Sequence, residues 1–138
     1  MASGNKIRVA LAVYLAVSVF AHHATTAVFD LARKVTVTGT LTQVDWVNPH
    51  IAMLIDAKNG SGDIQPWRIE TNPPAWFQRI NLERQNFAKA IGQTVIVEVN
   101  PAKDGTPYGF LMNIKFEDGT KIEVVPDQPL SRRNRASE

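Results

Sequence analysis

The chain contains no cysteine among its 138 residues. Disulfide bonds, thiolate metal sites and a cysteine nucleophile are therefore excluded. It also lacks a serine-containing nucleophile elbow and a glycine-rich phosphate loop, so the best-known enzyme signatures are missing. The acidic residues are scattered over predicted strands and turns, without a spacing that indicates a catalytic pair. We therefore expect a protein that is not an enzyme.

The chain also lacks a strong excess of charge of one sign. It has 15 basic and 13 acidic residues, and several of the basic residues lie near the two ends. Residues 22–131 carry ten basic residues against twelve acidic residues. A protein that binds nucleic acid normally presents a basic face on its folded part. We therefore expect no nucleic-acid partner.

The first 21 residues have the features of a secretory signal. Lys6 and Arg8 precede an apolar run from Val9 to Ala21, and the run ends in a typical cleavage pattern. A transmembrane helix needs about 20 apolar residues, so a retained membrane anchor is the less favoured alternative. We predict that residues 1–21 are a signal peptide cleaved after Ala21, that the protein is periplasmic, and that it meets a membrane only during export.

The remaining residues are too few for two ordinary domains. Residues 22–34 have weak periodicity and are predicted to form an N-terminal arm. Residues 35–126 alternate between apolar and polar side chains in several segments, as β-strands do. Residues 127–138 are proline, polar and arginine residues, which indicates a disordered basic tail. A single domain over residues 35–126 is expected.

The first predicted strand begins at Val35 and is rich in β-branched residues. Its alternation slips by one residue at Gln43, which is typical of a β-bulge. Gly39 offers a second place for the strand to bend. A long, bent first strand allows its two halves to join different neighbours, as is required to close a barrel.

The other elements follow from breakers and periodicity. Asn48-Pro49 ends the first strand, and the second is predicted to open at His50. A helical insertion is expected between the third and fourth strands, with Asn81 as an N-cap. The fifth strand is predicted to be formed by the segment with Phe110, Met112, Ile114 and Phe116.

This order of elements predicts an all-β fold with a helical insertion. Three strands, a helical segment, two strands and a short sixth strand match a small OB-like Greek-key barrel of five to six strands. The alternative is an open β-sandwich or an α+β roll.

Three histidines are the candidate metal ligands: His22, His23 and His50. If cleavage follows Ala21, His22 offers both its α-amine and its imidazole. Together with a second imidazole, from His23 or His50, these groups give three nitrogens in a plane, which suits Cu(II). Asp30 or Asp45 is a candidate oxygen ligand or hydrogen-bond partner. In the alternative interpretation, the N-terminus is solvated and His50 only bonds the loop backbone.

The predicted geometry sets a condition on a shared copper site. The arm enters the first strand at one end, whereas His50 follows its other end. Residues 22–33 can span about 40 Å if they are extended. The arm is therefore long enough to run back along a barrel to His50.

Trp46, Trp67 and Trp76 are candidates for a second kind of site. They can line an apolar groove on the barrel face, which is the usual binding surface of OB-folds. Such a groove would hold a small apolar molecule or a periplasmic protein partner. The alternative is that the three rings pack in the core or at its rim.

Four segments occur together in this chain: Ala21-His22-His23, Phe29-Asp30, Gly39 and Trp46-Val47-Asn48-Pro49-His50. In these residues the chain resembles a family of small exported bacterial proteins that is classed as a domain of unknown function. Ala24-Thr25-Thr26 departs from the Ser-Phe-Ala of typical members. The resemblance implies a small periplasmic β-barrel, and it brings no agreed cofactor or substrate.

Two expectations for function follow. The first is a periplasmic binding protein that holds copper through the N-terminal histidines and His50. The second is an interaction module that holds no metal and uses its aromatic barrel face. Copper, or no cofactor, is therefore expected.

Overall fold

The structure, a computed structural model, describes residues 25–125. The predicted signal peptide, the predicted tail at 127–138, and both His22 and His23 lie outside these residues. Six strands and two short helices follow a helical turn at residues 25–28. They are β1 (Val35–Asp45), β2 (Ala52–Lys58), β3 (Ile64–Glu70), α2 (Pro74–Gln78), α3 (Arg84–Ala88), β4 (Thr94–Pro101), β5 (Tyr108–Lys115) and β6 (Lys121–Glu123).

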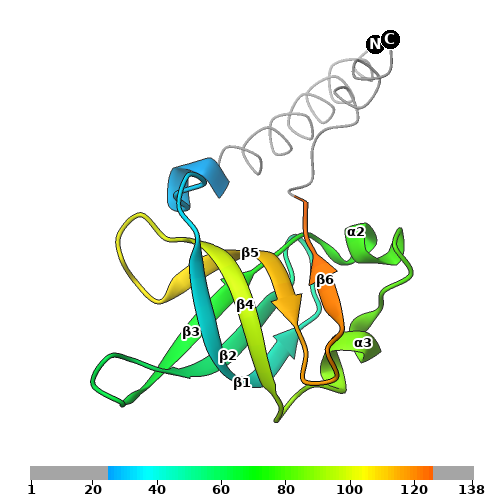
Figure 1. The fold of residues 1–138 in the computed structure, drawn as a ribbon. Helices are drawn as coiled ribbons and strands as arrows, with labels where there is room; N and C mark the ends of the chain where they lie inside the picture. Colours follow the sequence, from blue (N-terminus) through cyan, green and yellow to red (C-terminus); the bar gives the residue numbers. More distant parts are fainter. Residues whose placement is uncertain (1–24, 126–138) are drawn as a thin grey trace, which may run out of the picture.

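Five of the strands close into a barrel (Figure 1). The hydrogen-bonded order is β3-β2-β1-β4-β5, and a parallel pairing between β3 and β5 closes the ring. β6 adds to the outer edge of β5, and α2 and α3 connect β3 to β4. This is the topology of an OB-fold. The predicted all-β barrel with a helical insertion is confirmed.

The bend in β1 lies where the sequence predicts it. The first half of β1 pairs with β4 and its second half pairs with β2, and the register shifts between Leu41 and Gln43. Gly39 lies where the two pairings overlap. A Cβ at this position would lie 2.8 Å from the carbonyl carbon of Asp56 and 2.9 Å from Cγ2 of Ile55. Glycine is therefore required there because the backbone of β2 passes too close for any side chain.

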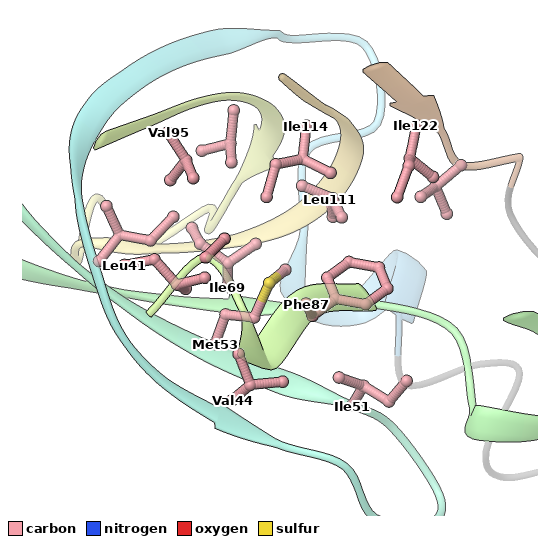
Figure 2. Packing of buried hydrophobic residues seen from close by; sticks show 14 of the residues in the cluster. Leu41, Val44, Ile51, Met53, Ile69, Phe87, Val95, Leu111, Ile114 and Ile122 are labelled. Carbon is pink, nitrogen blue, oxygen red and sulfur yellow. The ribbon is translucent and has the colours of Figure 1, made fainter. Parts of the chain in front are cut away.

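The interior of the barrel is filled by one cluster of apolar side chains, which we call the main core (Figure 2). Strand residues such as Leu41, Met53 and Ile69 have no exposed surface and point inward. Phe77 of α2 and Phe87 of α3 are also fully buried and pack on each other, with ring centroids 5.3 Å apart. The helical insertion therefore contributes to the main core, although its two helices have only five residues each.

Two details of the predicted elements are wrong. Asn81 is not a helix cap, because α3 is capped by Glu83, whose carboxylate and backbone exchange hydrogen bonds with Asn86. Asn81 has a positive φ of 59° and lies in the turn between α2 and α3. The second strand begins at Ala52, two residues after His50.

The fifth strand is present as predicted, but its alternating apolar residues do not all lie on one face. The pairing of β5 with β4 steps from Asn113 to Leu111, so Met112 is an extra residue in the strand. This bulge reverses the side-chain alternation. Leu111 therefore points into the main core, and Phe110 belongs to a separate cluster on the outside of the barrel.

One row of paired residues around the barrel links the last residue of β1 to the part of β4 that lies beside the start of β1. Starting from Asn100 on β4, successive paired residues around the barrel are Phe110, Glu70, Ala52 and Asp45, the last residue of β1. The side chain of Asn100 also donates hydrogen bonds to the carbonyls of Arg33, at 2.7 Å, and Leu31, at 3.5 Å, just before β1. The arm therefore enters β1 on the row of residues at which β1 ends.

Candidate functional site

His50 is held in the loop between β1 and β2 by its neighbour Ile51. The Ile51 side chain is fully buried in the main core. Its carbonyl accepts a hydrogen bond of 2.9 Å from the Thr71 amide, and its amide donates a bond of 3.4 Å to the Asn72 carbonyl. These contacts fix the loop against the end of β3. The His50 side chain is left 29% exposed on the outside of the barrel.

The imidazole of His50 faces a carboxylate on β3. Its Nδ1 lies 3.5 Å from Oε2 of Glu70, at the long limit for a hydrogen bond. The other carboxylate oxygen, Oε1, lies 3.4 Å from Nη2 of Arg68. When Nδ1–H of a histidine is directed at a carboxylate, Nε2 carries the free lone pair and can bind a metal. Glu70 therefore favours the tautomer of His50 that a metal ligand needs.

The surroundings of Glu70 keep it ionised. Hydrogen bonding with His50 is the main cause that lowers the pKa of Glu70 to about 2, and burial acts in the opposite direction. The Tyr108 hydroxyl and the charges of His50 and Arg68 lower this pKa further. Burial and the neighbouring Glu70 raise the pKa of the Tyr108 hydroxyl to about 12. At neutral pH Glu70 is therefore a charged carboxylate and Tyr108 is a neutral phenol.

Next to these polar groups lies an outer aromatic cluster, made by Phe29, Ala102 and Phe110 with the partly buried Tyr108. The ring of Phe110 lies 5.8 Å from the ring of Phe29 and 6.5 Å from the imidazole of His50, measured between centroids. Its interplanar angle with His50 is 83°, an edge-to-face arrangement. Phe110 thus contacts both the arm and the predicted metal ligand.

The two aspartates considered as partners of the histidines make other contacts. Asp30 accepts a hydrogen bond of 3.1 Å from the backbone amide of Ala32. Asp45 accepts one of 2.7 Å from the side chain of Gln43. The carboxylate beside His50 is Glu70, which sequence reasoning missed. The turn at residues 59–63 sets the register that aligns Glu70 with Ala52, so the hairpin pattern was the available signal.

The three tryptophans pack against the main core. The ring of Trp46 lies 5.7 Å from Phe77 and 5.5 Å from Phe87. Trp76 is 9% exposed and lies 4.8 Å from Phe77, while Trp67 covers the core from β3. Within residues 25–125, no aromatic contact joins two of the tryptophans. A ligand groove made by these rings stays a prediction.

Of the three histidines predicted to bind the metal, only His50 lies in the part of the chain that the structure describes. Among residues 25–125, no three histidine, aspartate or glutamate side chains are grouped closely enough to hold a metal ion. None of the helices in the same range is long and apolar enough to cross a membrane.

Comparison with known proteins places these residues in one family. A model described as "Family of unknown function (DUF6152)" matches residues 10–111. The chain belongs to this family. The resemblance to a domain of unknown function is thereby confirmed, and the matched range contains the double histidine together with His50, Glu70 and Phe110. No curated protein and no solved structure matches the chain.

Proposed function

We propose that the protein is an exported periplasmic binding protein, not an enzyme, and that it binds copper. In this proposal His22 chelates the ion through its α-amine and imidazole, and His50 adds an imidazole through Nε2. His23 is the alternative source of the last nitrogen. The observation that carries the proposal is the contact between His50 and Glu70, because a carboxylate on the second nitrogen is the usual partner of a histidine that binds a metal.

The donor set favours copper among the divalent metals. Three nitrogens in a plane suit the tetragonal preference of Cu(II), and copper binds nitrogen ligands most tightly in the first-row series. The chain has no thiolate that would instead favour a tetrahedral zinc site.

The position of the arm supports the proposal. The Phe29 ring contacts Phe110, which contacts the His50 imidazole. Only five residues separate Phe29 from His23, so the chain keeps His23 within about 20 Å of Phe29. Through Phe110, Phe29 lies on the same face of the barrel as His50, so the arm has no need to run back along β1.

The first test concerns cleavage of the signal peptide, because a retained signal peptide would leave His22 without a free α-amine. Intact mass measurement of the protein recovered from the periplasm should show a chain that begins at His22. A chain that retains residues 1–21 would contradict cleavage and remove the chelating amine from the site.

The copper site is tested with a chain that begins at His22 and the same chain with its α-amine acetylated. Cu(II) affinity is measured by competition with a chelator, and the nitrogen ligands are followed by EPR. We expect acetylation to weaken binding by at least about tenfold, since it removes the terminal amine from the chelate. Equal affinity of the two chains, or no binding by the first, would overturn the proposal.

The contribution of His50 and Glu70 is tested in the chain that begins at His22. His50→Gln should remove one nitrogen from the EPR spectrum, and Glu70→Gln should weaken binding by about 10- to 100-fold. Val47→Ala is a matched control, because Val47 lies in the same loop and is 55% exposed. An unchanged spectrum in His50→Gln would assign the last nitrogen to His23.

A further inference from the structure

Phe29 is buried on the outside of the barrel. Its side chain is 3% exposed, and its ring lies 4.8 Å from Tyr108 and 5.8 Å from Phe110. These residues belong to the outer aromatic cluster, which is separate from the main core. The Phe29 side chain therefore anchors the arm to the outside of the barrel and is not part of the main core.

Backbone contacts on both sides of Phe29 fix its position. Phe29 forms an antiparallel bridge with Ala102, directly after β4. The Asp30 amide donates to the Pro101 carbonyl at 2.9 Å, and the Lys103 amide donates to the Val28 carbonyl at 2.9 Å. The arm thus continues the sheet for a few residues along β4, with the Phe29 ring as the only large buried side chain on residues 25–34.

The residues that contact the Phe29 ring also lie beside His50 and Glu70. Phe110 touches the Phe29 ring with one part of its surface and the His50 imidazole with another. Tyr108 touches the Phe29 ring, and its hydroxyl is near enough to Glu70, the partner of His50, to help lower the pKa of that carboxyl. Docking of the arm and orientation of His50 therefore share two side chains.

We propose that Phe29 is a positioning residue that sets the copper affinity by holding the arm at the His50 site. The inference rests on the proposed copper site, and Phe29 itself binds no metal. When Phe29 is docked, the histidines are tethered five to six residues from the anchor. When it is released, the tether lengthens to about 12 residues, up to β1, which lowers the effective concentration of the N-terminal ligands.

The test uses chains that begin at His22 and carry Phe29→Ala, Phe29→Leu or Val28→Ala. Val28 is the matched control, because it is the neighbouring arm residue and is 39% exposed. Docking is measured by hydrogen exchange of the Asp30 and Lys103 amides, and Cu(II) affinity is measured by chelator competition. Thermal unfolding verifies that the barrel stays folded in each variant.

We expect Phe29→Ala to speed exchange at both amides and to weaken copper binding by about tenfold, from the longer tether and the lost preorganisation. At saturating Cu(II) its EPR spectrum should match that of the wild type, since every ligand is retained. Phe29→Leu should restore most of the affinity, and Val28→Ala should have no effect.

The inference and the proposed function fail in different ways. Wild-type affinity in a Phe29→Ala chain with fast-exchanging amides would overturn the inference and leave the copper site standing. Slow exchange at both amides in that variant would show that Phe29 is not the anchor. If the wild-type chain bound no copper, the proposed function and the inference would both be wrong.

Discussion

Phe110 and Glu70 are paired residues on the parallel β3–β5 ladder that closes the barrel. Both side chains lie on the outside, where Phe110 receives the Phe29 ring and Glu70 faces His50. This pairing thus places the apolar contact of the arm, through Phe29, beside the polar contact of the β1–β2 loop, through His50.

Glu70 should make the stability of the protein sensitive to acid. Its pKa is 4.5 in an unfolded chain and about 2 in the fold, so the folded state favours the charged form. This stabilisation is complete above pH 4.5 and is lost as the pH falls toward 2. We expect it to be about 1 to 2 kcal/mol, less than the full shift implies, because water reaches the pair.

Urea unfolding of the wild type and of Glu70→Gln at about pH 6 and about pH 3 measures this effect. The difference in unfolding free energy between the two proteins should shrink at the lower pH. Glu123→Gln is the control, because Glu123 forms an exposed pair with Lys121 and should change the pH dependence little. Parallel pH profiles for the wild type and Glu70→Gln would contradict the structure.

The Tyr108 hydroxyl should lose its proton only at unusually high pH. The protein has two tyrosines, and the other, Tyr14, lies in the predicted signal peptide. In a chain that begins at His22, the tyrosinate absorbance therefore reports Tyr108 alone, with an expected midpoint near pH 12. Glu70→Gln should lower the midpoint, but keep it above 10, because burial is the larger cause of the shift. A midpoint near 10 in the folded wild type, verified by circular dichroism, would refute this environment.

Gly39→Ala should destabilise the barrel by about 1 to 3 kcal/mol. The added methyl group meets the backbone of Asp56, which cannot move without disturbing the β1–β2 pairing. Gly60→Ala is the matched control, since nothing lies within 4 Å of a Cβ there. The free energy of unfolding from urea titration measures both, and equal values for the two variants would be inconsistent with the close approach at Gly39.

Phe87→Ala should cost about 3 to 5 kcal/mol of unfolding free energy. Its ring is fully buried and packs against Trp46, Phe77 and Phe116, so truncation leaves a cavity at the end of the main core. Ile91→Ala is the control, because Ile91 follows α3 and is 46% exposed. A small loss for Phe87→Ala would mean that the helical insertion is not part of the core.

Much of the fold could be predicted because its signals are local. The slip at Gln43 marks the bulge in β1, since a change of side-chain parity can be read from neighbouring residues. Breakers such as Asn48-Pro49 likewise mark the ends of strands. The cap of α3 was missed because Asn81 and Glu83 are two residues apart and both can accept a hydrogen bond from an N-terminal amide.

The sequence by itself determined the order of the strands and the bend in β1 that allows a barrel to close, and it singled out His50 as a candidate ligand. Only the tertiary structure decided what surrounds that histidine. The bulge at Met112 depends on pairing with β4, and it turns Phe110 outward to receive Phe29. The contact with Glu70 depends on the register of β2 and β3. One row of paired residues around the closed barrel then links the last residue of β1 to the part of β4 beside its start, a relation between distant strands that no local pattern records.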